Sequence, residues 1–289
     1  MEQKLTLRAA VTNIVILIMK FIGGMLAHSS ALVADAAHSA ADAVNDVAAL
    51  FYIRMEKKGV NEQHDYGYGR YATMAYLLIS VLLCAAAIWI GYHAVGEIIA
   101  WFEGEYMERP GWLALAVVVV AVLVKYLLYR YTRSEAADSD SEILAHNAQR
   151  YRNDVISSIG TAIAVGCAIM LSHKWVIIDS VAAFIIAVFL LITAYRIFHT
   201  AVDELLDKSL SEEMEEEIRK IVAQDKDIMA VTDVMTRRVG GRASLELVVE
   251  MEGTLSLNEV HRHVLALEEK LSEYLGQTSH MAVHVNPYD

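Results

Sequence analysis

Proline and cysteine are scarce in this chain, with two of each among 289 residues. Cys84 and Cys167 both fall inside apolar runs, so no pattern supports a disulfide framework or a thiolate zinc finger, and both are expected to be packing residues. Basic residues are also outnumbered, because 24 Lys and Arg face 36 Asp and Glu, for a net charge of −12. This excess of acid argues against a nucleic-acid partner, whose phosphates favour a basic surface.

Long apolar runs are what the sequence has in abundance. Hydrophobic residues make up 56% of the chain, which is too many for an ordinary soluble domain of this length. Six stretches each hold the roughly 17–25 apolar residues that a helix needs to cross about 30 Å of hydrocarbon. The first of them lacks a signal-peptide cleavage site and is expected to be a span. The sequence therefore predicts a six-helix transmembrane domain over residues 1–208, with spans at 9–27, 31–53, 71–101, 112–131, 143–171 and 175–198.

Basic residues beside the predicted spans gather on one side of the membrane. The other side carries only Arg109 and Lys174. By the positive-inside rule the richer side is cytoplasmic, so both termini are expected in the cytoplasm. As a separate expectation, the protein is integral to a bacterial or archaeal plasma membrane. The basic residues of that side are Lys4, Arg8, Arg54, Lys57, Lys58, Arg70, Arg130 and Arg133.

The last part of the chain has a different character. Residues 201–289 hold 9 basic and 19 acidic residues, which indicates an aqueous environment. A charged helical pattern at 211–224 is followed by strand-like runs at 231–239 and 243–252, a second helix at 256–275 and a last strand at 280–287. This order predicts a small α+β domain of αββαβ type over residues 209–289.

A polar stripe interrupts the second predicted span, in the sequence VADAAHSAADAVND. Asp35, His38, Asp42 and Asn45 are three or four residues apart and so share one face of a helix. Asp42 is near the middle of the span, four residues or roughly 6 Å of helix rise from the imidazole of His38. One interpretation is polar packing between helices rich in small residues. Because a buried aspartate is costly unless paired, and oxygen and nitrogen donors suit ions such as zinc, we favour a metal site.

The fifth predicted span begins with a polar half, AHNAQRYRND, and continues with an apolar half. Asp154 marks the junction, deep enough to meet Asp42 if the two helices are neighbours. His146, Asn147, Arg150 and Asp154 recur at near-helical spacing, which predicts that this half lines an aqueous vestibule. Alternatively, His146 and Arg150 belong to a solvated extension of the helix, and only Asp154 is buried.

Four motifs together resemble the cation diffusion facilitator family: H-x-x-x-D in the second span, D-V-I-S-S in the fifth, H-D-Y-G-Y-G-R between the second and third, and V-H-V-N-P near the end. The likeness covers essentially the whole chain. It implies a homodimeric, proton-coupled exporter of zinc and related ions, not an enzyme, with six spans and a cytoplasmic ferredoxin-like domain used for metal binding and dimerisation. By position, it also implies that His38, Asp42 and Asp154 are ligands of the transport site.

One ligand position departs from the family pattern. Zinc-transporting members commonly have a histidine four residues before the aspartate of the fifth span, where this chain has Arg150, which has no lone pair for a metal. His146 or Asn147 could take the place of that histidine, water could complete the coordination shell, or the fixed positive charge could replace part of the ion's role. The sequence leaves these alternatives open.

Two further pairs correspond to family positions outside the transport site. His261 and His284 match two ligands of a cytoplasmic metal site, although Val248 replaces a third ligand, and surface or packing histidines are the alternative. Arg70 and Asp207 match a lysine and an aspartate whose charges interlock near the dimer interface. Here the alternative is an unrelated loop arginine and helix-terminal acid.

The sequence as a whole predicts proton-coupled efflux of a divalent cation from the cytoplasm. Zinc is the first candidate, and manganese, iron, cobalt, nickel and cadmium are the others. No cofactor is expected besides the transported ion and protons, and the expected partners are the lipid bilayer and a second copy of the chain. A membrane metal sensor without transport and a transporter of organic cations are the alternatives.

Overall fold

The computed structural model describes residues 2–56, 61–105, 107–139, 142–171, 173–276 and 280–288, leaving out the side chains of 2–10, 45–56, 138–139, 142–143, 146 and 173. Contacts between residues divide the chain into two compact units. One unit holds residues 1–47 and 79–196, and the other holds 48–78 and 197–289. The second unit therefore combines the C-terminal domain with a segment from the first third of the chain.

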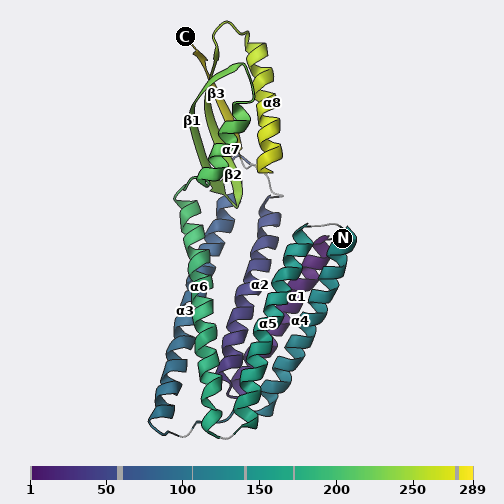
Figure 1. Cartoon of the computed structure of the whole chain (residues 1–289), viewed down its shortest axis with the longest axis vertical. Coiled ribbons are helices and arrows are strands. Elements are labelled where there is room, and N and C mark those ends of the chain that lie inside the picture. The colour runs from purple at the N-terminus through teal and green to yellow at the C-terminus, as the bar shows by residue number, and fades with distance from the viewer. Residues whose placement is uncertain are drawn as a thin grey trace. The chain divides into compact units, whose positions relative to one another are not determined.

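Long helices account for most of the described residues before position 206 (Figure 1). Four of them, α3 to α6, are long and apolar enough to cross a membrane, and α1 contributes the shorter apolar stretch Val11–Leu26. The polar stripe expected in the second span lies on α2. The helices are α1 (Glu2–Leu26), α2 (Ser30–Glu56), α3 (Gly69–Phe102), α4 (Trp112–Ser139), α5 (Glu142–Met170) and α6 (Ile177–Leu205).

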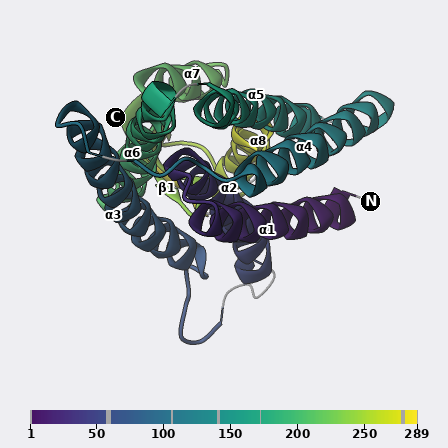
Figure 2. The ribbon, with the colours of Figure 1, turned by 90° about the horizontal axis from the view of Figure 1, so that it is seen from below.

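Small side chains let the helices of the first unit approach closely. Seen from below, α4 lies between α1 and α5 (Figure 2), and α3 runs beside α6 in both views (Figure 1 and Figure 2). Gly23 of α1 shows how close the approach is, because an added Cβ would lie 2.8 Å from a methyl carbon of Val117 on α4. Ala34 of α2 is fully buried in a cluster with Ala94 of α3 and Ala183 of α6. Van der Waals packing of small residues is the usual basis of helix association in a bilayer.

The C-terminal domain has the order α7 (Glu212–Val222), β1 (Ile228–Val239), β2 (Arg242–Glu252), α8 (Leu257–Leu275) and β3 (His280–Tyr288). The three strands form one sheet in the order β1-β2-β3, in which β2 pairs antiparallel with β1 and parallel with β3. A two-glycine turn joins β1 to β2. Gly240 and Gly241 have φ of 61° and 76°, which a residue with a Cβ adopts only at a cost.

Alternation along β2 builds the core of this domain. Leu245, Leu247 and Val249 are buried on one face of the strand and pack in one cluster with Ile218 of α7 and Leu271 of α8. The two helices thus cover the same face of the sheet. The prediction of a helical membrane domain followed by an αββαβ domain is confirmed.

Candidate metal site

Three predicted ligands come together in the first unit. A ring nitrogen of His38 and one carboxylate oxygen each of Asp42 and Asp154 all lie within 4.8 Å of one another. The first two residues are one helical turn apart on α2, and Asp154 is contributed by α5. The i, i+4 spacing of α2 and the polar-to-apolar junction of α5 therefore meet at one place.

The ligand atoms are withdrawn from water and have unused capacity. The side chains of Asp42 and Asp154 are 13% and 5% exposed. Nδ1 of His38 and Oδ2 of both aspartates are buried and make no hydrogen bond within the described part of the chain. Buried polar atoms normally form hydrogen bonds, so three atoms of metal-binding type that lack one mark a place for an ion. One imidazole and two carboxylates suit a divalent transition metal.

A lysine faces the same carboxylates. Nζ of Lys125, on α4, lies 3.4 Å from Oδ2 of Asp154 and 3.7 Å from Oδ2 of Asp42, and the lysine side chain is 3% exposed. The cluster therefore contains an ammonium group as well as three possible ligands. The sequence reasoning missed it.

Asp35, the first residue of the predicted polar stripe, is paired with a second buried lysine and not with the candidate metal site. Nζ of Lys20, on α1, lies 2.7 Å from Oδ2 of Asp35 and donates hydrogen bonds to Oγ of Ser39 at 3.1 Å and of Ser158 at 3.0 Å. Both charged side chains are almost completely buried, at 0% and 1% exposure. Asp35 is thus committed to a closed ion pair linking α1, α2 and α5. The side chain of Asn45, the last member of that stripe, lies outside those described.

The contested positions of α5 lie toward its N-terminal end. Asn147 is half-buried and seven residues from Asp154, which corresponds to roughly 10 Å of helix rise. The side chain of His146 lies outside those described. Arg150 is also half-buried, with its guanidinium carbon 5.4 Å from the centre of the Tyr151 ring. Replacement of the family histidine by either neighbour stays a prediction.

Both lysines carry a signal that the sequence does show. Lys20 interrupts the apolar run IVILIMKFIGGML, and Lys125 interrupts VVVVAVLVKYLLY. An ionisable residue inside a membrane span is costly and faces a partner or a cavity, so each was a candidate functional residue. Their partners depend on which helices are neighbours.

The histidines predicted for a cytoplasmic site are both exposed. His284 lies on β3 opposite Val248 of β2, and His261 lies on α8. The group of metal-capable side chains that the described part of this domain brings together is a different one, Asp225, Asp227 and His263. Nδ1 of His263 is 2.8 Å from Oδ2 of Asp225 and its Nε2 is 3.4 Å from Oδ2 of Asp227.

The charges of that group affect one another. Burial of Asp225 opposes ionisation, but hydrogen bonds from His263 and from the backbone N–H of Asp227 outweigh it and lower the pKa of the Asp225 carboxyl. The imidazole is thus held by two carboxylates. The three side chains can therefore be explained by ion pairing among themselves, and they could also bind a metal.

Arg70 and Asp207 form a direct contact inside one chain. Nη2 of Arg70 lies 2.6 Å from Oδ1 of Asp207, and both side chains are nearly half exposed. Asp207 follows α6 with a φ of 55°, and its other oxygen lies 3.9 Å from Nη1 of Arg237 on β1. The contact joins the beginning of α3 to the segment after α6, within the second unit.

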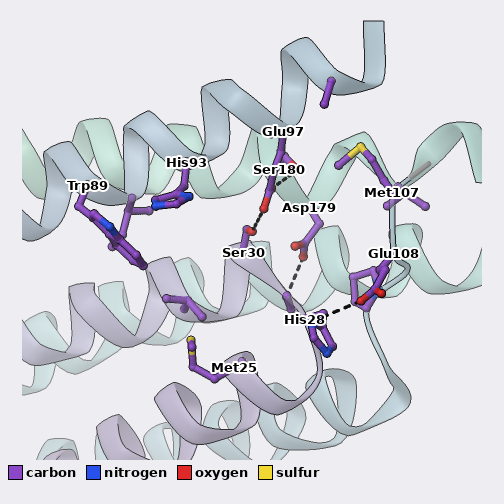
Figure 3. Close-up of a pocket in the computed structure, with 17 residues that line it drawn as sticks. Met25, His28, Ser30, Trp89, His93, Glu97, Met107, Glu108, Asp179 and Ser180 are labelled. Carbon is purple, nitrogen blue, oxygen red and sulfur yellow. Dashed lines mark hydrogen bonds and ion pairs between the residues drawn. The ribbon is translucent and has the colours of Figure 1, made fainter. Parts of the chain in front are cut away.

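A separate pocket of about 500 Å³ lies where α1 turns into α2, beside α3 and α6 (Figure 3). Glu97 accepts hydrogen bonds from the hydroxyls of Ser30 and Ser180. Asp179 accepts one from Ser29 at 2.8 Å and one from the backbone N–H of Ala31 at 3.2 Å. These hydrogen bonds hold the first turn of α2 against α3 and α6. We therefore interpret Glu97 and Asp179 as structural residues.

Comparison with known proteins agrees with this architecture. Residues 6–206 match the family model of the cation efflux transmembrane domain, and residues 210–288 match that of the cation efflux protein cytoplasmic domain. The manganese efflux system protein MneP of Bacillus subtilis (strain 168) is 24% identical over 99% of this chain and 96% of its own length.

Two other relatives cover most of both chains. The manganese efflux system protein MneS of the same organism is 29% identical over 94% of this chain and 90% of its own. The cation-efflux pump FieF of Shewanella oneidensis is 24% identical over 89% and 85%. With both domain models matched in order, this chain is an integral membrane transporter with a cytoplasmic C-terminal domain, and it belongs to the cation diffusion facilitator family.

Proposed function

We propose that this divalent-cation efflux protein carries its ion through His38, Asp42 and Asp154 and exchanges it for protons. The observation that supports this site is the convergence of three buried donor atoms within 4.8 Å, from two helices of the membrane domain. Metal and proton compete for the same lone pairs, because a ligand must be deprotonated to bind a metal. Alternating exposure of one site to the two sides of the membrane then couples the two fluxes.

Manganese is the first candidate for the ion and zinc is the second. Two of the three donors are carboxylates, which suit manganese, whereas the single imidazole also suits zinc. The absence of a second histidine four residues before Asp154 favours the harder ion. Two relatives whose names denote manganese efflux agree with this order.

The remaining parts of the proposal concern the surroundings of the site. Asn147 and His146 belong to the approach from the cytoplasm, because roughly 10 Å or more of helix rise separates them from Asp154. The protein acts as a homodimer, which agrees with the match to the family's cytoplasmic domain. It needs no cofactor besides the transported ion and protons. His261 and His284 stay candidates for a further, surface metal site.

Flux measurements in sealed vesicles test the site. Proteoliposomes containing the wild-type protein should accumulate Mn²⁺ only while protons move in the opposite direction. Asp42→Ala should abolish accumulation, because the remaining donors cannot enclose the ion. Glu105→Ala is the matched control, since this carboxylate is exposed outside the site, and it should transport normally. Transport by Asp42→Ala at the wild-type rate would contradict the proposal.

The same vesicles separate the alternatives. A membrane metal sensor would bind Mn²⁺ or Zn²⁺ at equilibrium without moving it across the bilayer. An organic-cation transporter would bind neither metal and would not need His38. Comparing Mn²⁺, Zn²⁺ and Fe²⁺ at equal free concentration then gives the order of preference.

A further inference from the structure

Lys125 is the one member of the cluster that cannot ligate a metal while it carries its charge. Its ammonium nitrogen lies 3.4 Å from Asp154 and 3.7 Å from Asp42, on a side chain that is 3% exposed. A cation so deep in a membrane domain is stable only beside opposite charge. The two carboxylates of the candidate site, which come from different helices, supply that charge.

The contacts between Lys125 and the two carboxylates, at 3.4 and 3.7 Å, are longer than hydrogen bonds between charged groups. Both facing oxygens, Oδ2 of Asp42 and Oδ2 of Asp154, are without a hydrogen bond within the described part of the chain. Charge-assisted hydrogen bonds of this type are normally about 2.7–2.9 Å long. The ammonium therefore balances charge at the site without using up the lone pairs that a metal would need.

A metal ion would need the same two oxygens. An ion bound between Asp42 and Asp154 would lie within a few ångströms of Nζ, where a divalent charge and an ammonium repel each other strongly in a medium of low dielectric constant. The flexible four-carbon stem of lysine allows the head group to move aside. Binding of the ion and retention of the ammonium are thus mutually opposed.

We propose that the Lys125 ammonium is a tethered cation that occupies the Asp42–Asp154 pair when no metal is present and that each transported ion must displace. This inference rests on the proposed function and adds to it a residue that sets affinity. The ammonium lowers the affinity of the site for the ion and speeds release, because it returns to the carboxylates as the ion leaves. An exporter gains from this, since a site of two unopposed carboxylates would hold its ion too long.

Equilibrium binding of Mn²⁺ to the full-length protein in detergent tests the sign of the effect. Lys125→Met removes the charge and keeps the length of the side chain, and its Kd should fall at least tenfold below that of the wild type. Lys125→Arg keeps the charge and can grip both carboxylates, so its affinity for Mn²⁺ should not rise above that of the wild type. In vesicles Lys125→Met should show a lower KM and a lower kcat. An unchanged or weaker affinity in folded Lys125→Met would overturn the proposal, because a merely structural lysine predicts that result.

A matched control removes a different buried ion pair. In Lys20→Met/Asp35→Asn both charges of the closed pair are lost, and neither residue belongs to the three-ligand group. Its Kd for Mn²⁺ should change less than threefold. A tenfold tightening in this control too would assign the effect to general loosening of the bundle and would overturn the specific role of Lys125.

A measurement on the wild-type chain covers the case in which Lys125→Met does not fold. In protein labelled with ¹⁵N at lysine Nζ, saturation with diamagnetic Zn²⁺ should shift the Lys125 signal and leave the Lys20 signal in place. An unmoved Lys125 signal at saturation would overturn the displacement.

If the wild type neither binds nor moves any divalent ion, the proposed function itself fails. If it transports but Lys125→Met binds no more tightly, only the present inference fails.

Discussion

Two lysines are buried in the membrane domain, and their surroundings differ. Lys20 lies 2.7 Å from Asp35 and donates hydrogen bonds to two serines. Lys125 lies 3.4 and 3.7 Å from Asp154 and Asp42, whose facing oxygens make no hydrogen bond among the described residues. The first lysine is satisfied by its neighbours, whereas the carboxylates around the second keep lone pairs to spare.

The difference separates a structural ion pair from one that can be exchanged. A closed pair stabilises one arrangement of helices and gains nothing from opening. An under-satisfied pair leaves carboxylate oxygens available to another cation. We infer that the geometry of an ion pair, more than its burial, distinguishes a structural ion pair from the proposed transport site in this protein.

The largest expected effect comes from breaking the closed pair. Lys20→Met leaves the Asp35 carboxylate buried without its partner, which should lower the free energy of unfolding by about 3–5 kcal/mol. Lys20→Met/Asp35→Leu removes the uncompensated charge and should recover most of that loss. Denaturation in mixed micelles measures both. A loss in Lys20→Met no greater than in Lys125→Met would remove the distinction between the two lysines.

A substitution in the Asp42–Asp154 pair beside Lys125 should abolish most transport with little loss of stability. Asp154→Asn takes away one of three donors, and Mn²⁺ flux should fall at least 100-fold, equivalent to about 2.7 kcal/mol. Its amide keeps the size of the carboxylate, so the unfolding free energy should stay close to that of the wild type. Initial rates in vesicles are the measurement, and substantial flux through Asp154→Asn would show that the ion follows another path.

The sequence singled out the three residues of the candidate site, but it did not identify the partners of the two lysines. Spacing places His38 and Asp42 on one helix face, and the change from polar to apolar residues places Asp154 at a depth inside the membrane. Those are properties of single helices. Which acid a lysine meets depends on the packing of α1 and α4 against α2 and α5, which no local pattern encodes.

The same limit explains the polar stripe. Asp35 shares a helix face with Asp42 in the sequence, and helical spacing alone assigns both to one site. In the structure the closed pair with Lys20 separates them. The αββαβ domain was predictable for the opposite reason, because alternation along β2 and the Gly240-Gly241 turn are local signals.

An exposed ion pair should show a smaller effect than either buried one. Arg70 and Asp207 are 2.6 Å apart but 47% and 44% exposed, so either charge reversal, Arg70→Glu or Asp207→Arg, should lower the unfolding free energy by less than about 1 kcal/mol. If the contact also matters for transport, the double reversal should restore flux that each single reversal loses. If the double variant does not recover flux, the contact between Arg70 and Asp207 is not what transport requires of these two residues.

The smallest effect should be the acid sensitivity of the cytoplasmic group. Burial opposes ionisation of Asp225, but the hydrogen bonds from His263 and from the backbone N–H of Asp227 together outweigh it and keep the pKa of the carboxyl below its ordinary value. Its stabilising contribution is therefore complete above the unfolded pKa of about 3.9 and is lost as the pH falls through the lower folded value. The loss should stay below about 1 kcal/mol. Hydrogen exchange of α7 and α8 in the full-length protein between pH 5 and pH 3 measures it, with Asp225→Asn as control. An equal pH dependence in Asp225→Asn would assign the sensitivity to other carboxylates.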